Sequence, residues 1–206
     1  MTDRFSNMSK LPDEPAARML ATANAKLETE IDAPANAPAE VLLTELQEKG
    51  ALIDTIRLLS VLLPARERVW WSCLAARDII GDDEKMITPP LAASEAWVFK
   101  PSEENRETAR ASIEHAGIDD DSVLCATSVL YADGTLGPGD LAEYPAPAGA
   151  SEVTAFAMNI VALKAHSDRM EEYGQMLIDR AVDIARGGNG QVEAGASKPD
   201  DVEKDK

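Results

Sequence analysis

Two cysteines and two histidines are the residues of this chain that could carry out nucleophilic catalysis: Cys73, Cys125, His115 and His166. A catalytic thiol needs its pKa lowered by a base, a cation or a helix N-terminus. Cys73 instead falls in the middle of an apolar helical pattern, where burial raises the pKa of a thiol. We therefore expect both cysteines to be free and buried. A cysteine-dependent enzyme that uses a histidine stays as an alternative.

The acidic and glycine-rich stretches do not fit a metal site or a phosphate site. Calcium loops place acidic residues at alternating positions, with a glycine at the turn and a distal bidentate Glu. Neither GDDEK (81–85) nor DDDS (119–122) has this spacing, and helix capping explains both more simply. The stretch DGTLGPGD (133–140) lacks the preceding strand and the lysine of a phosphate loop. We therefore expect no metal, no cofactor and no enzymatic activity.

The tryptophans are the side chains that could hold an apolar ligand. Trp70 and Trp71 are adjacent in LPARERVWWSCLAAR (63–77), and neighbouring residues on a helix point about 100° apart. The two indoles therefore cannot enclose one ligand, and an indole usually buries its hydrocarbon body while its N–H finds one partner. We expect a structural core that contains Trp70, Trp71, Cys73, Trp97 and Arg106. In this core we expect Arg106 to make a cation–π contact with Trp97 or to pair with an acidic residue near the Trp70–Trp71 helix. An apolar ligand pocket between the tryptophan helices, or a partner surface, stays as an alternative.

Charge and composition exclude several classes of function. The chain has 206 residues, of which 20 are basic and 37 acidic, for a formal net charge of −17. Because phosphates and anionic lipids attract clustered Lys and Arg, we expect no nucleic-acid partner and no membrane surface, although an acidic chain can bind a basic protein. The N-terminus lacks the apolar stretch of a secretory signal, and no apolar run approaches the ~20 residues that span a bilayer. We expect a cytoplasmic protein.

Hydrophobic periodicity predicts an all-α fold, a compact irregular bundle of about seven helices. Hydrophobic residues make up 45% of the chain and aromatic residues 4%, which favours helix over sheet. Periods near 3.6 residues recur and no segment alternates convincingly. The helical patterns lie within residues 38–50, 51–64, 64–81, 91–100, 103–117, 122–132 and 151–186.

The domain organisation follows from the Pro-rich and Gly-rich stretches. Three prolines with small residues follow the weak helical pattern after residue 13, which is typical of a linker. We expect a flexible N-terminal arm and linker over 1–37, a helical domain over 38–186 and a disordered C-terminal tail over 187–206.

The last helical pattern is the candidate interaction surface. A continuous helix over 151–186 would reach roughly 54 Å and outrun a small domain. Its second half would then expose an apolar stripe that contains Met170, Tyr173, Leu177 and Ile184. We expect this stripe to bind a protein partner, or a second copy of the chain in a homodimer. A break near Ser167, which folds the second half back against the N-terminal arm, is the alternative.

Two segments resemble a bacterial family, domain of unknown function 6931. The shared features are Leu63, Pro64, Arg66, Trp70 and Trp71 in the first segment, then Trp97, Val98, Pro101, Arg106 and Ala109 in the second. The resemblance extends roughly over residues 55–165. It implies no established activity and no catalytic residue. It does imply an accessory role of the kind associated with type VI secretion genes.

Three hypotheses of function follow. The first is a non-enzymatic interaction protein, an adaptor or chaperone-like accessory of a bacterial type VI secretion system. The second is a small-molecule sensor with an apolar pocket between the tryptophan helices. The third is the cysteine-dependent enzyme. The absence of a recognisable site and the strong acidity favour the first hypothesis.

Overall fold

The computed structural model describes residues 4–81 and 83–192 and shows an all-α fold, as the periodicity predicts. Within these residues the only β pairing is an isolated bridge between Thr135 and Pro145. The described part has nine α-helices instead of about seven: α1 Ala16–Thr22, α2 Ala39–Glu48, α3 Leu52–Leu62, α4 Ala65–Ile80, α5 Pro89–Phe99, α6 Glu103–Glu114, α7 Val123–Leu130, α8 Ala150–Ala165 and α9 Met170–Ala185. Three short 3₁₀ helices join them: η1 Glu84–Met86, η2 Gly139–Glu143 and η3 Ser167–Arg169.

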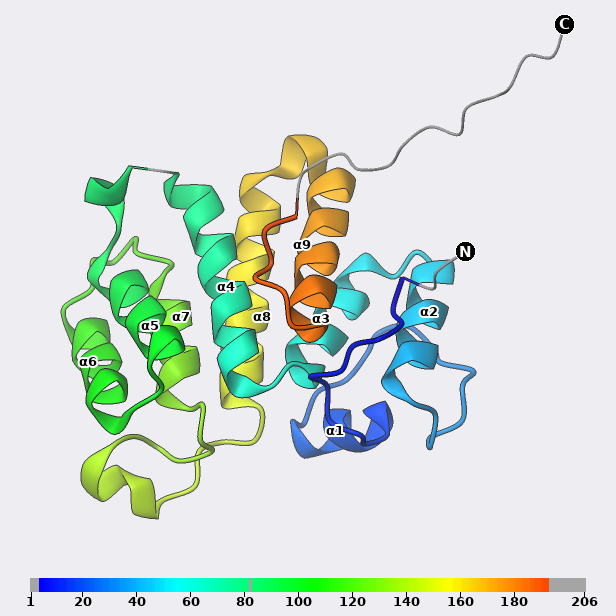
Figure 1. The fold of residues 1–206 in the computed structure, drawn as a ribbon, viewed down its shortest axis with the longest axis horizontal. Coiled ribbons are helices and arrows are strands. Elements are labelled where there is room, and N and C mark those ends of the chain that lie inside the picture. The colour runs from blue at the N-terminus through cyan, green and yellow to red at the C-terminus, as the bar shows by residue number, and fades with distance from the viewer. Residues whose placement is uncertain (1–3, 82, 193–206) are drawn as a thin grey trace, which may run out of the picture.

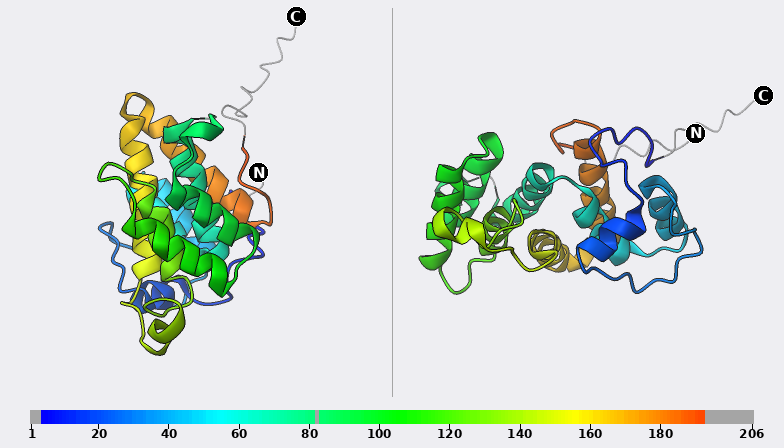
Figure 2. Two further views of the ribbon diagram at one scale, coloured as in Figure 1. Left: turned by 90° about the vertical axis from the view of Figure 1, so that its left-hand side faces the viewer. Right: turned by 90° about the horizontal axis from the view of Figure 1, so that it is seen from below.

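Helices α4 and α8 lie side by side at the centre and run in the same direction (Figure 1). Helices α5, α6 and α7 pack on one side of this pair, and α1, α2, α3 and α9 lie on the other. The view from below in Figure 2 shows the central pair between the two groups. Because α4 has neighbours on both sides, it must be apolar over most of its circumference, and this explains the width of its apolar pattern.

Local sequence signals set several helix ends. Pro64 stands at the N-cap of α4, and Pro89 occupies the first turn of α5, where a missing N–H removes no helical hydrogen bond. The Ser102 hydroxyl caps α6 by accepting a hydrogen bond from the Asn105 N–H at 3.3 Å. Helix α4 ends at Gly81, whose φ of +82° suits glycine.

The segment 151–186 is two helices and not one long helix. Helix α8 ends at Ala165, the η3 turn follows, and α9 runs back beside α4, α8 and α3. Folding back buries an apolar stripe that a projecting helix would leave in water. The alternative of a break near Ser167 is therefore confirmed. The predicted contact with the N-terminal arm is also present, since the Nε of Arg186, directly after α9, donates to the Ser6 carbonyl at 2.9 Å.

The break removes most of the predicted interaction surface. Tyr173, Leu177 and Ile184 are buried in the core, and only Met170, with 44% of its surface exposed, stays accessible. The prediction that this stripe binds a partner is wrong for the three buried residues. Packing against α3 is close, since a Cβ added at Gly174 would lie 2.6 Å from the Leu52 side chain.

The described part of the N-terminal arm packs on the helical body, so the prediction of a flexible arm does not hold for residues 4–37. Phe5 and Met8 are buried beside the helices. The Lys10 N–H donates to the Ala185 carbonyl at 2.9 Å and thereby satisfies one of the last carbonyls of α9, which have no partner within their helix. Farther along, the arm crosses the start of α8 so closely that a Cβ at Gly149 would lie 2.0 Å from the Ala23 oxygen.

The first residues of the predicted disordered tail are also placed. The Gly188 N–H donates to the Asp183 carbonyl, and the Gly190 N–H donates to the Asp183 carboxylate, both at 2.8 Å. Residues 187–192 therefore continue along the surface of α4 and α9, where Gly190 lies against Leu74 and Ile184. The prediction for 193–206 lies outside the described residues.

We predict that Leu177→Asp destabilises the whole molecule, because it buries an unpaired carboxylate at the centre of the core. The free energy of unfolding should fall by more than about 3 kcal/mol. Met170→Asp is the matched control, and it should change stability by less than about 0.5 kcal/mol because Met170 is exposed. Urea unfolding of both variants tests this. Equal stability of the two variants would contradict the placement of α9.

Candidate docking surface

The two adjacent tryptophans have different environments. Trp71 is fully buried, and its indole N–H donates to the Leu177 carbonyl at 2.9 Å, which ties α4 to α9. Trp70 is half-buried, and its N–H donates to the Asn189 carbonyl at 2.8 Å, which holds the segment after α9. Trp97 is buried on α5. These contacts are structural, and the indole N–H of each residue in the adjacent pair donates a hydrogen bond to a main-chain carbonyl.

Cys73 and Cys125 are fully buried free thiols on α4 and α7. Burial raises the pKa of Cys73 well above the usual value, and the neighbouring Cys125 thiol raises it further. The described contacts of the histidines are with other groups: His115 Nδ1 lies 2.9 Å from the Ala111 oxygen, and His166 stacks on Tyr173 with ring centroids 4.0 Å apart. A neutral buried thiol without a histidine beside it is poorly suited to nucleophilic catalysis.

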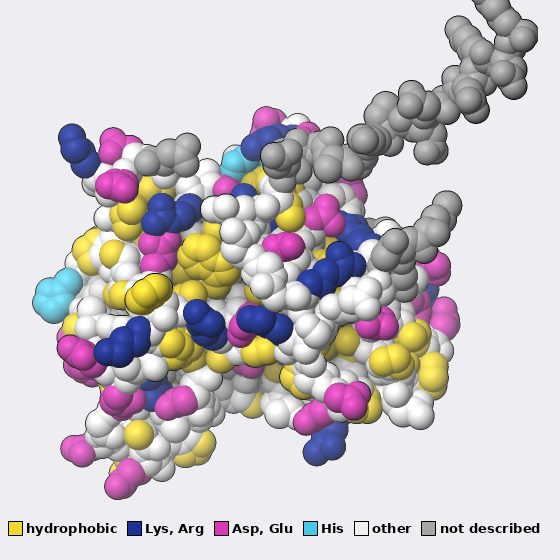
Figure 3. All heavy atoms as spheres, in the orientation of Figure 1, with side chains coloured by type: hydrophobic (Ala, Val, Ile, Leu, Met, Phe, Trp, Pro, Cys, Tyr) yellow, Lys and Arg dark blue, Asp and Glu magenta, His cyan; other side chains and the backbone are white. Residues whose placement is uncertain are grey.

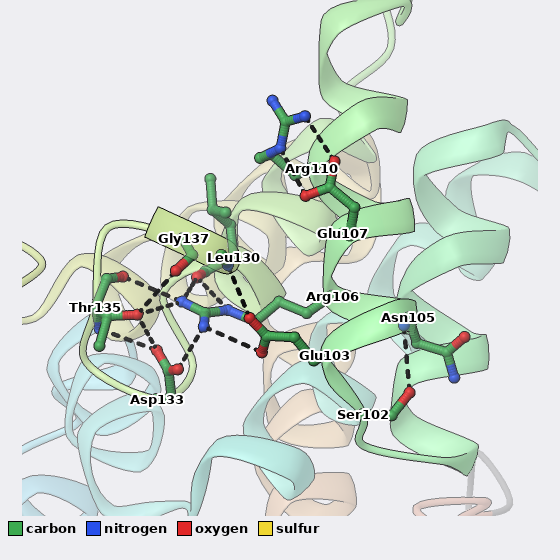
Figure 4. Close-up of polar contacts among 11 residues, drawn as sticks. Ser102, Glu103, Asn105, Arg106, Glu107, Arg110, Leu130, Asp133, Thr135 and Gly137 are labelled. Carbon is green, nitrogen blue, oxygen red and sulfur yellow. Dashed lines mark hydrogen bonds and ion pairs between the residues drawn. The ribbon is translucent and has the colours of Figure 1, made fainter. Parts of the chain in front are cut away.

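Arg106 holds α6 to the end of α7 (Figure 4). Its side chain is 3% exposed, its Nε and Nη2 donate to the Leu130 carbonyl, and its Nη1 pairs with Asp133. Nη2 also donates to the Thr135 hydroxyl at 2.7 Å. From the sequence we expected a contact with Trp97 or with an acidic residue near the tryptophan pair. The structure instead directs the guanidinium to the carbonyl end of α7 and the loop that follows, so its role is structural.

The arginines around the tryptophan pair are also occupied. Arg77 pairs with Glu95 of α5, and Arg68 pairs with Glu152 of α8 at 2.8 Å. Arg68 borders a hollow of about 570 Å³, but its Nε and Nη2 donate to the carbonyls of Ser60 and Leu63. These side chains pair with neighbouring helices, and they are not free to bind phosphate. On the face in Figure 3, Lys and Arg side chains are scattered among Asp and Glu.

An apolar hollow of about 470 Å³ opens at the C-terminal end of α4. Its walls come from four parts of the sequence: the last turns of α4, Thr88 at the start of α5, the 117–122 loop before α7, and α8. Figure 2 (left) shows this loop beside the upper part of α8. The lining residues are Ala76, Ile79, Ile80, Thr88, Gly117, Ile118, Asp119, Asp120, Asp121, Ser122 and Met158. Trp70, Trp71 and Trp97 line neither this hollow nor the one beside Arg68.

Hydrogen bonds fix the loop that forms one wall of the hollow. The Asp120 carboxylate accepts from the Ser122 N–H at 3.0 Å and from the Ser122 hydroxyl at 2.6 Å. The hydroxyls of Ser122 and Thr88 lie 2.5 Å apart, which joins the loop to the start of α5. The loop is therefore preorganised, so that it loses little backbone conformational entropy when a partner binds to it.

The hollow combines an apolar interior with an acidic rim. Met158 and Ala76 are buried at its floor, whereas Ile79 is 40% exposed and Ile118 is fully exposed. Asp119 and Asp121, which follow Ile118 in the chain, also line the hollow and are exposed. Among the described residues, neither carboxylate forms an ion pair with a Lys or Arg. We therefore treat this hollow as the candidate docking surface.

Sequence reasoning missed this surface because it assigned DDDS only to helix capping. Capping is part of the explanation, since Asp120 does fix the turn before α7. The available signal was Ile118, a large aliphatic residue between a helix-ending glycine and three aspartates. In the described part of the chain, no group of three or more His, Cys, Asp or Glu residues could hold a metal ion. Likewise, no described helix has the length and apolar character needed to cross a membrane.

Comparison with known proteins gives one match. The model of a family of unknown function, DUF6931, matches residues 42–185. The chain belongs to this family. No curated protein and no solved structure matches the chain. The DUF6931 match begins inside α2 and ends at the last residue of α9, so it extends beyond the 55–165 range of the sequence resemblance.

Two contacts explain the segments by which the chain resembles DUF6931. The Arg66 Nε in the first segment donates to the Val98 carbonyl in the second at 2.6 Å. Arg106 in the second segment then fixes the end of α7. The shared residues thus join α4, α5, α6 and α7 into one unit.

We predict that native Cys73 and Cys125 react slowly with iodoacetamide at neutral pH, because both thiols are buried and the pKa of Cys73 is raised. Mass spectrometry should detect labelling of both only after urea unfolding. Rapid labelling of either thiol in the folded protein would contradict this placement and support the enzyme alternative.

We also predict that Arg106→Lys lowers the free energy of unfolding by about 1 to 3 kcal/mol, because an ammonium cannot reach Leu130, Asp133 and Thr135 together. Arg110→Lys is the matched control on the same helix. Arg110 pairs with Glu107 and Glu114 at the surface, so its replacement should have little effect. Urea unfolding measures both, and equal losses would contradict a special role for Arg106.

Proposed function

We propose that this DUF6931 protein is a non-enzymatic interaction protein, an adaptor that binds a protein partner at the apolar hollow beside α4. The observation that carries the proposal is the pair of accessible isoleucines, Ile79 and Ile118, at a preformed apolar hollow. Single exposed apolar residues are ordinary on protein surfaces. Here two of them border a hollow with a buried apolar floor, which is the arrangement that accepts an anchoring side chain.

The energetic argument concerns Ile118. Burial of its side chain on binding is favourable by about 1.5 to 3 kcal/mol of free energy. The loop that carries Ile118 is held by hydrogen bonds at Asp120 and Thr88. A partner that covers Ile118 and fills the hollow would gain this free energy without a rearrangement of the chain.

Other observations favour binding over catalysis. The thiols are buried, and Arg68, Arg77 and Arg106 are engaged in ion pairs with neighbouring elements. Of the predicted stripe on α9, only Met170 is accessible, so α9 cannot offer this stripe to a protein partner or to a second copy of the chain. The proposed protein interface is therefore the hollow. We propose that the protein has no nucleic-acid partner, on the basis of the net charge of −17. The cytoplasmic setting that we expect from the sequence stays a proposal. The resemblance suggests an accessory of type VI secretion.

Site-specific photo-crosslinking tests this proposal. A benzophenone amino acid replaces Ile118 in the full chain, which is expressed in the cells from which it comes. The same substitution at Phe99, another strongly exposed apolar residue, is the control. We expect a protein adduct at position 118 that is absent at position 99 and that disappears when Ile79→Lys is added. Adducts of equal yield at both positions, or only small-molecule adducts, would contradict a protein-binding hollow.

A further inference from the structure

We propose that the partner bound at the hollow is a basic amphipathic segment, with aliphatic side chains that enter the hollow and Lys or Arg side chains that meet Asp119 and Asp121. This inference rests on the proposed function and adds the chemistry of the partner. The geometry supports it because the exposed Ile118 directly precedes Asp119 in the chain, and Asp119 and Asp121 line the same hollow as the apolar side chains of α4 and α8.

The charges at the rim determine the sign of the partner. Asp119 and Asp121 are exposed and form no ion pair with a described Lys or Arg. Some exposed acids elsewhere on the molecule, such as Glu107 and Glu114, do have a basic neighbour, Arg110, at 2.6 Å. Uncompensated carboxylates beside an apolar hollow attract a cation that is attached to an apolar group.

The same charges argue against occupants from this chain. Two copies would each bring a net charge of −17 to the contact, so self-association at an acidic rim is electrostatically unfavourable. The segment 193–206 contains five acidic and three basic residues, so its net charge is also negative. A basic segment of another protein is the occupant that the charges favour.

The interior of the hollow determines the apolar part of the partner. Its volume of about 470 Å³ lies within the range in which proteins bury compact ligands, and its floor is formed by Met158 and Ala76. In the 117–122 loop, the hydroxyl of Ser122 donates to the carboxylate of Asp120 and contacts the hydroxyl of Thr88, so these polar side chains already have partners within the protein. Aliphatic side chains such as Leu therefore fit the interior better than polar ones.

The test uses a fluorescein-labelled helical peptide in which Leu recurs at positions i and i+4 and Lys occupies the remaining sites. Two matched peptides replace Lys by Glu, or Leu by Ser. Fluorescence anisotropy with the full chain measures the dissociation constants. We expect binding of the Leu–Lys peptide, at least tenfold weaker binding of the other two, and weakening by added salt, because exposed charge pairs are screened.

Variants of the chain locate the binding. Ile118→Ser, and separately the double variant Asp119→Asn with Asp121→Asn, should each weaken the Leu–Lys peptide by about tenfold. The matched controls are Phe99→Ser, and Asp168→Asn with Glu172→Gln, which change exposed residues away from the hollow and should leave binding unchanged. Circular dichroism verifies that every variant folds.

The outcomes separate this inference from the proposed function. Binding of the Leu–Glu peptide instead, abolished by Ile118→Ser, would overturn the basic partner and leave the docking hollow in place. Equal binding of the Leu–Lys peptide to the wild-type chain and to both hollow variants would overturn the basic partner at this site, as would no binding to the wild-type chain. A crosslinked protein partner at position 118 would still support the proposed function in those cases.

Discussion

The indole N–H of Trp71 donates to the Leu177 carbonyl at 2.9 Å in the centre of the molecule, and the arrangement of the chain depends on this contact between α4 and α9. Near the end of α4, Asp78 accepts a hydrogen bond from the Tyr173 hydroxyl at 2.7 Å and pairs with Arg180. With α9 fixed on α4, its apolar stripe is removed from water. The N-terminal arm and residues 187–192 then pack on the exposed sides of the two helices.

This arrangement also determines which apolar surface remains available. A projecting α9 would have offered Tyr173, Leu177 and Ile184 to a partner, but folding back uses all three in the core. The C-terminal end of α4 is different, because an open hollow separates it from the 117–122 loop, which the hydrogen bonds of Ser122 join to Asp120 and to the start of α5. The hollow between them stays open while its neighbours are closely packed. The proposed docking surface therefore lies where side-chain packing is incomplete and where carboxylates have no ion pair with a described Lys or Arg.

Local signals made much of the fold predictable. Helix periodicity and capping residues such as Ser102 act over a few positions, so the all-α class and most helix positions followed from the sequence. The break after Ala165 was harder, because residues 166–169 contain neither Gly nor Pro and only burial of the α9 stripe decides it. The arm was missed because Phe5 and Met8 are isolated apolar residues without a period, and their contacts depend on the far end of the chain.

The candidate site was the least predictable part, because its walls come from α4, the start of α5, the loop before α7 and α8. Methyl-resolved NMR of the full chain, labelled at Ile and Met, tests its role most directly. We predict that the Leu–Lys peptide shifts the methyl signals of Ile79, Ile118 and Met158 and leaves those of Ile56 and Ile184, in the core beyond α4, unchanged. Shifts confined to Met170 or to residues outside the hollow would contradict the account.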